Sequence, residues 1–145
     1  MKFRYSLQKV LDLKNSEKNQ AEWMLSEAIG KLQMEERQLN SLLDEQHAER
    51  EALISGNGLT ISTLVARQNY LDYLEREIQR KSSDVEQAHL LVMEKQQNLH
   101  DKVLDEKVWT KAKEKAYRKH LTFILKKEQG ELDEMATLRH QIGEI

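Results

Sequence analysis

Residues 54–63 read ISGNGLTIST and contain two of the five glycines in this 145-residue chain, Gly56 and Gly58. Only Asn57 separates them. Because glycine and asparagine adopt positive φ angles easily, this stretch predicts a reversal of the chain. The chain has no proline, whereas an average chain of this length would hold about seven at ~5% usage. We therefore expect helix on both sides of a turn at residues 55–61.

Apolar residues recur every seven positions on both sides of this turn. Such a repeat is typical of the seam of a left-handed coiled coil. Facing residues of an antiparallel pair have numbers with a constant sum, and a sum of 117 pairs Leu53 with Leu64 and Leu32 with Val85. The midpoint of this register falls in the turn, so the register is sterically possible. The two series are Leu11, Leu25, Leu32, Leu39 and Leu53, then Leu64, Leu71, Ile78, Val85, Val92 and Leu99.

These patterns predict an all-α fold, a long two-helix antiparallel coiled-coil hairpin that forms one domain over residues 1–145. We expect the first helix over residues 1–54 and the second over residues 62–145. Ser6 is placed to cap the first helix, and Thr60 or Ser62 to cap the second.

The seven-residue repeat ends after Leu99, and a weaker apolar stripe follows near the C-terminus. This stripe predicts a projecting C-terminal helical extension of roughly thirty residues, with Gly130 as the point where the helix is interrupted. Its members are Leu121, Leu125, Leu132, Met135 and Ile142.

Several classes of function are disfavoured by composition. The chain has no cysteine, and its five histidines show no paired metal-ligand spacing, so we expect no metal site and no cofactor. No nucleotide-binding loop or serine–base arrangement is present either, so we do not expect an enzyme. No apolar run reaches membrane-spanning length, which predicts a cytoplasmic protein without direct membrane insertion.

Basic side chains gather in residues 107–127, where eight of them accompany one acid, Glu114. Three interpretations remain open: a solvated helix face, a contact for an acidic protein surface, and a nucleic-acid contact that also uses Trp109 and Tyr117. Salt-dependent DNA binding would distinguish the last. A purely structural coiled coil that pairs with itself is a further alternative.

A second candidate surface lies near the turn. Gln38 and Leu42 are spaced i, i+4, as are Tyr70 and Leu74, so each pair shares one helix face beside the seam. These residues form either a thicker core or an exposed apolar patch for a partner.

Three segments of the chain resemble the FliJ family of flagellar type III export proteins. The opening FRYSLQKVLDLKNSEKNQAEWML, residues 3–25, resembles the start of the Gram-positive members. The segment NYLDYLEREI, residues 69–78, resembles the family's sequence just after the turn, and ELDEMATLRH, residues 131–140, resembles its tail. The matching tail positions are Leu132, Asp133, Glu134, Met135, Ala136 and Arg139.

The resemblance implies a non-enzymatic part of the flagellar export apparatus, similar in shape to the central stalk of rotary ATP synthases. Its implied partners are the export ATPase ring, the cytoplasmic domain of a membrane export-gate protein and the export chaperones, with no nucleic acid. The implied location is cytoplasmic, peripheral to the cell membrane at the flagellar base, and we expect a monomer when the chain is alone.

Residue by residue, the resemblance assigns a gate-binding patch to Gln38, Leu42, Tyr70 and Leu74. Glu45 and Glu49 stand where some members have tyrosine. The opposite, open end is expected to bind the ATPase, with contact residues Lys111, Lys113, Lys115, Arg118, Leu121, Leu125, Leu132 and Met135.

Overall fold

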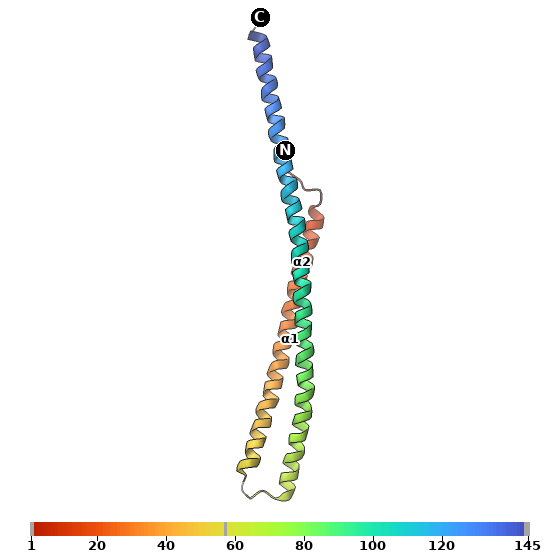
Figure 1. The fold of residues 1–145 in the computed structure, drawn as a ribbon, viewed down its shortest axis with the longest axis vertical. Helices are drawn as coiled ribbons and strands as arrows, with labels where there is room; N and C mark the ends of the chain where they lie inside the picture. The colour runs from red at the N-terminus through yellow and green to blue at the C-terminus, as the bar shows by residue number, and fades with distance from the viewer. Residues whose placement is uncertain (1, 57, 144–145) are drawn as a thin grey trace. The chain divides into compact units, whose positions relative to one another are not determined.

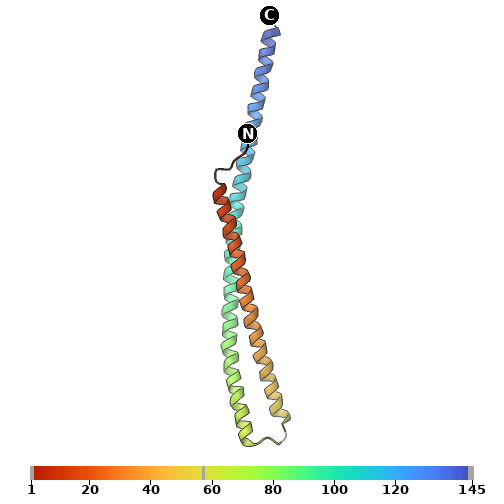
Figure 2. The same ribbon diagram turned by 180° about the vertical axis from the view of Figure 1, so that it is seen from behind.

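The structure, a computed structural model, describes residues 2–56 and 58–143 and is helical over nearly all of them. Helix α1 spans Gln8–Ser55 and helix α2 spans Ile61–Gly143. The all-α hairpin is confirmed, since the two helices run side by side (Figures 1 and 2). Helix α2 continues through Gly130, so the predicted interruption there is wrong.

The turn between the helices depends on its glycines. Gly58 has a φ of 84°, a conformation that side chains disfavour. A Cβ on Gly56 would lie 2.9 Å from the carbonyl oxygen of Ala52, closer than packed atoms approach. Asn57, the middle residue of the predicted turn, lies outside the described residues.

Of the two residues predicted to cap α2, Thr60 and Ser62, the structure shows Thr60 in that role. The backbone amide of Thr63 donates a hydrogen bond of 3.2 Å to the hydroxyl of Thr60, the residue before the helix. Helix α1 begins two residues beyond Ser6, and the amide of Gln8 donates to the carbonyl of Tyr5 at 3.1 Å. A backbone bond therefore closes the start of α1 where we had expected a Ser6 cap.

The chain divides into two compact units, which we describe separately. The terminal unit comprises Met1–Asn19 and Asp101–Ile145, and the turn unit comprises Gln20–His100. Among the described residues six apolar side chains are buried, and all six belong to the turn unit. They are Ala21, Ala28, Leu71, Leu74, Ala88 and Val92.

In the turn unit, ion pairs across the seam define the register. Glu35 pairs with Lys81 at 2.7 Å and Glu49 with Arg67 at 3.6 Å. The residue numbers of each pair add to 116, which agrees within one residue with the predicted sum of 117. Antiparallel pairing of α1 and α2 near the turn is therefore in the expected register.

These pairs also mark a second series of seam positions that the sequence analysis missed. It lies three residues after the first series on each helix, as a heptad requires. At the same sum of 116, Ala28 faces Ala88 and Leu42 faces Leu74. Small and charged residues occupy most of this series: Ala21, Ala28, Glu35, Leu42 and Glu49 on α1, and Arg67, Leu74, Lys81, Ala88 and Lys95 on α2.

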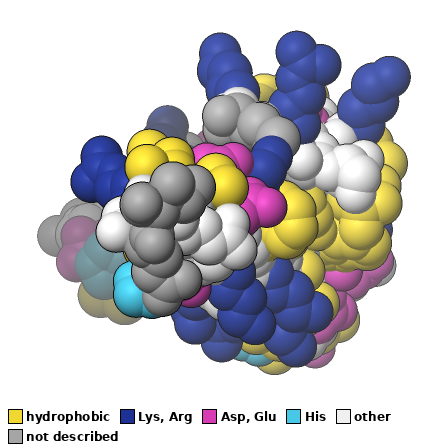
Figure 3. All heavy atoms as spheres, turned by 90° about the horizontal axis from the view of Figure 1, so that it is seen from above, with side chains coloured by type: hydrophobic (Ala, Val, Ile, Leu, Met, Phe, Trp, Pro, Cys, Tyr) yellow, Lys and Arg dark blue, Asp and Glu magenta, His cyan; other side chains and the backbone are white. Residues whose placement is uncertain are grey.

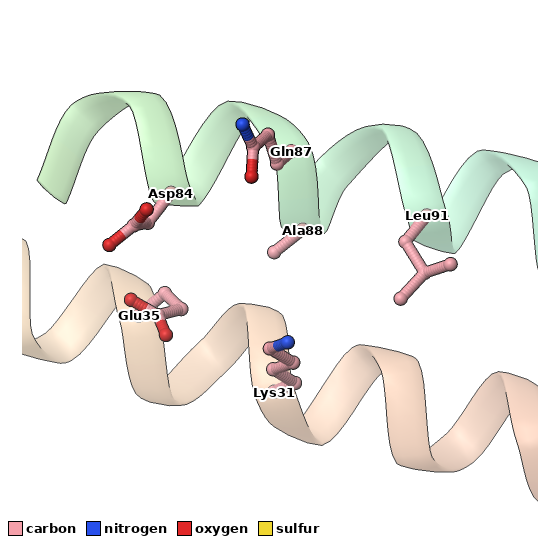
Figure 4. Close-up of a pocket in the computed structure, with 6 residues that line it drawn as sticks. All are labelled: Lys31, Glu35, Asp84, Gln87, Ala88 and Leu91. Carbon is pink, nitrogen blue, oxygen red and sulfur yellow. The ribbon is translucent and has the colours of Figure 1, made fainter. Parts of the chain in front are cut away.

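The small alanines leave shallow grooves beside the seam. One groove of about 410 Å³ lies between Lys31 and Glu35 of α1 and Asp84 and Ala88 of α2, with the two carboxylates facing the space between the helices (Figure 4). Since Lys81 lies 2.7 Å from Glu35 and 3.9 Å from Asp84, one cation serves both acids. The groove is open and charged, which does not suit a small apolar ligand.

Candidate interaction surfaces

Leu74, which the resemblance assigns to the gate-binding patch, is the most deeply buried large side chain of the described residues, at 1% exposure. Of the two interpretations, Leu74 therefore fits the thicker core, and its assignment to an exposed contact patch is wrong. Its heptad position is the reason, because Leu74 faces the half-buried Leu42 across the second seam series. Gln38, one turn before Leu42, is exposed.

An aromatic pair forms the exposed part of this region. Tyr70 is 36% exposed and Tyr73 is 49% exposed, and their rings stack with centroids 6.1 Å apart. The tip surface, as we call it, consists of Gln38, Leu42, Tyr70 and Tyr73. In the sequence Tyr73 accompanies Tyr70 among the apolar residues near the turn, and its spacing of three places both on one face, but it was not among the predicted contact residues.

Glu45 and Glu49, beside the tip surface, each contact a residue of α2. The hydroxyl of Tyr70 donates a hydrogen bond to the carboxylate of Glu45. This bond, with a smaller contribution from burial, raises the pKa of Tyr70 to about 12. Glu49 pairs with Arg67. Both acids therefore hold α1 against α2 beside the tip surface.

In the terminal unit, ion pairs replace the apolar core. Lys14 lies 2.9 Å from Asp105, Lys18 lies 3.0 Å from Glu106, and Lys102 lies 3.5 Å from Glu17. The hydrogen bond to Asp105 is the main cause that raises the pKa of Lys14. These six side chains join the start of α1 to α2.

The first residues of the chain continue along α2 without helical structure. The ring of Phe3 contacts Tyr117 edge-on and His120, each with a centroid distance of 5.2 Å. The Nε2 atom of His120 is buried and has no hydrogen-bond partner. His120 therefore differs from the other four histidines, which are exposed.

The predicted basic contact residues lie along α2 in the terminal unit. Lys111 and Lys115 are exposed, as is Arg118, which lies 4.0 Å from Glu114. Lys113 is half-buried and lines a depression of about 380 Å³ together with Arg4. Positive charge from the residues before α1 and from α2 thus meets here, as the predicted sum of 117 for Arg4 and Lys113 requires. Figure 3 shows lysine and arginine side chains projecting beside hydrophobic ones on the face seen from above.

Beyond this basic segment, α2 presents apolar side chains to solvent. Of residues 121–143, only Ile124 is even half-buried. The exposed fractions of the predicted contact residues are 41% for Leu121, 64% for Leu125, 60% for Leu132 and 53% for Met135. Leu138 and Ile142 are exposed as well. We call Leu121, Leu125, Leu132, Met135, Leu138 and Ile142 the C-terminal stripe.

Two further features are absent from residues 2–56 and 58–143. No group of three or more histidine or acidic side chains there is placed to hold a metal ion. No helix in those ranges combines the length and apolarity that a membrane span requires.

Comparison with known proteins agrees with this architecture. The solved structure of a YscO homolog, CT670 from Chlamydia trachomatis, superposes with a TM-score of 0.75 at 22% identity, over 99% of this chain and 98% of that chain. This likeness concerns the fold. No curated protein matches the chain significantly in sequence. Residues 2–143 match the family described as Flagellar FliJ protein. The chain belongs to this flagellar FliJ family and is therefore a protein associated with flagellar type III export.

Proposed function

We propose that the chain is a non-enzymatic coupling factor, similar to a central stalk, between the export ATPase ring and the membrane export gate. In this account the terminal unit binds the ring, the tip surface binds the cytoplasmic domain of the gate protein, and the chain also assists export chaperones with their substrates. It works in the cytoplasm, at the membrane beneath the flagellum.

One observation carries the ring contact: the C-terminal stripe is apolar and nothing in the described chain covers it. Exposed apolar surface of this extent is typical of an interaction site. The neighbouring basic residues Lys111 and Lys115 have no acid paired with them in the described ranges, and grouping like charges opposes folding. An acidic ring surface would use them for steering and orientation.

The gate contact is supported by the stacked pair of Tyr70 and Tyr73. Aromatic residues are enriched where proteins bind one another, since they offer a large contact area with few rotatable bonds. Leu74 takes no part in this proposal because it is buried.

The test of the ring contact is charge reversal in the chain, Lys111→Glu with Lys115→Glu, assayed by ATP hydrolysis of the purified ring. We expect the chain to stimulate hydrolysis, more strongly at low salt, and the reversal to remove most of this stimulation. The matched control is Arg76→Glu with Arg80→Glu, which has the same spacing and charge change on α2 in the turn unit. If both variants stimulate equally at both salt concentrations, the basic residues are only a solvated face.

The nucleic-acid alternative is examined with the same variants. It predicts that the Lys111 and Lys115 reversal lowers the affinity for duplex DNA and reduces the salt dependence of binding. Our proposal predicts only weak DNA binding that the control variant weakens equally.

A further inference from the structure

A depression near the start of the chain gathers positive charge that the chain itself does not neutralise. It has a volume of about 380 Å³ and lies in the terminal unit, between the first residues of the chain and α2. Its two cations come from opposite sides, Arg4 from the segment before α1 and Lys113 from α2. We call this depression the N-terminal notch, and its lining residues are Phe3, Arg4, Tyr5, Gln8 and Lys113.

Elsewhere in the described ranges the two arms of the chain meet through opposite charges. Five ion pairs cross from α1 to α2 there, among them Lys14 with Asp105 at 2.9 Å and Lys81 with Glu35 at 2.7 Å. In the notch two cations line one depression, and neither has an ion-pair partner among residues 2–56 and 58–143. Because like charges brought together oppose folding, an anion from outside the chain would relieve this arrangement.

The surroundings of the notch do not supply such an anion. Residues 2–11 contain three cations and no acid, and the first turn of α1 contains no acid either. Asp12, the next acid along α1, accepts a hydrogen bond of 2.8 Å from Gln8. In residues 107–127 the single acid, Glu114, already contacts an arginine at 4.0 Å. The electrostatic potential at the notch therefore favours an acidic ligand.

The rings that line the notch favour a peptide over a nucleic acid. Phe3 is half-buried, with its ring held against Tyr117 and His120 at centroid distances of 5.2 Å, and Tyr5 is half-buried as well. Rings fixed in this way do not offer the free face on which a base stacks. They form an apolar wall beside two cations, which suits an acidic side chain with an apolar neighbour. The guanidinium of Arg4 has the planar donors that bind a carboxylate through two hydrogen bonds.

We propose that the N-terminal notch binds an acidic peptide segment of a protein partner, with a carboxylate held between Arg4 and Lys113. The source of this segment rests on the proposed function, in which it belongs to the export ATPase ring. Lys111 and Lys115 then attract the ring over a distance, whereas the notch fixes one of its carboxylates in place. The segment before α1 is thereby part of the contact, together with α2.

The first test measures the affinity of the full chain for the purified ring by surface plasmon resonance. We expect Arg4→Gln with Lys113→Gln to weaken binding by about tenfold or more, because both sides of the notch lose their cation. The matched control is Lys2→Gln with Lys119→Gln, which removes the same charge from the same two segments at exposed positions outside the notch. It should weaken binding by less than about threefold. Equal losses would mean that only net charge matters, and would overturn the proposal.

A stability measurement excludes a merely structural role for the two cations. Since the charges of Arg4 and Lys113 lie in one depression without an acid, removing them should leave the melting temperature unchanged or raise it. Circular dichroism measures both helicity and melting. A notch variant that melts earlier than the Lys2 and Lys119 control would show that these cations support the fold, which contradicts the proposal.

The second test alters the shape of the notch without changing its charge. Phe3→Ala removes the ring that holds the first residues against α2, so we expect ring binding to weaken by about threefold or more through lost preorganisation. Leu7→Ala is the control, because Leu7 is 43% exposed in the same segment and does not line the notch. If Phe3→Ala and Leu7→Ala bind the ring equally well, the notch is not a formed site and the proposal is wrong.

The outcomes also distinguish the notch from the proposed function. A ring that does not bind the unchanged chain contradicts both. A ring that binds the unchanged chain and the two double variants equally contradicts the notch alone. If Arg4→Gln with Lys113→Gln loses affinity for duplex DNA but not for the ring, the ligand is a nucleic acid and the proposal is wrong.

Discussion

The turn unit and the terminal unit are built from the same two helices but are held together differently. The turn unit contains all six buried apolar side chains found among the described residues. The described residues of the terminal unit include none, and Lys14, Lys18 and Lys102 join its helices through ion pairs with acids. Partly exposed ion pairs contribute little net stability, whereas buried leucine contributes much. Stability from apolar burial is therefore concentrated in the turn unit, whereas the C-terminal stripe of the terminal unit leaves its apolar side chains exposed.

The largest expected effect is that of Leu74→Ala. Because Leu74 is 1% exposed and faces Leu42, removing its side chain should lower the free energy of unfolding by about 2–4 kcal/mol. Leu90, which is 58% exposed on the same helix, provides the matched control. Leu90→Ala should change the free energy of unfolding by less than about 0.5 kcal/mol. Urea denaturation followed by circular dichroism measures both. Equal effects would mean that the turn unit has no distinct core.

Next in size are the glycines of the turn. Gly58→Ala forces a side chain into a positive φ, and we expect it to destabilise the chain by about 1 kcal/mol. Gly30→Ala is the control, because Gly30 lies in α1 with open space around it. It should instead stabilise the chain by roughly 0.5–1 kcal/mol. Thermal unfolding of both variants shows the opposite signs, and a stabilising Gly58→Ala would argue against a specific turn.

A smaller difference between the two units is expected in how their amide exchange responds to salt. High salt screens the ion pairs of Lys14, Lys18 and Lys102 but leaves apolar burial intact. We expect the backbone amides of residues 11–19 to exchange with deuterium faster in about 1 M sodium chloride than in about 0.05 M. The deuterium exchange rate of the backbone amides of residues 21–53 should differ less between the two salt concentrations. A uniform response along α1 would show that ion pairs are no more important at one end than at the other.

The smallest effect concerns one hydroxyl. Folding raises the pKa of Tyr70 from 10.0 to about 12 through its bond to Glu45, so the folded chain holds this proton more tightly than the unfolded chain. The stabilisation is complete below pH 10 and is lost as the pH rises toward 12. Ultraviolet titration should show one of the four tyrosines ionising late, and Tyr70→Phe should remove that step. A titration that lacks this late step would contradict the contact between Tyr70 and Glu45.

Much of the fold was predictable because a seven-residue repeat and one turn determine the register. The pairing of Glu35 with Lys81 lies within one residue of the expected sum. The second seam series was not found, since alanines and charges give no hydrophobic signal at its positions. For the same reason the sequence left open whether Leu74 is core or surface, because Leu74 and its partner Leu42 both belong to that series. The exposure of Leu121 and Leu132 could be predicted because the seven-residue repeat that marks the seam ends after Leu99.

The central claim is that the projecting end of α2 is the contact for the export ATPase ring. The most direct measurement compares ATP hydrolysis by the ring with the full chain, with a chain truncated after residue 120, and with the variant Tyr70→Ala plus Tyr73→Ala. The account predicts that truncation abolishes stimulation, whereas the tyrosine variant stimulates like the full chain because its substitutions lie in the turn unit. Full stimulation by the truncated chain would contradict the account.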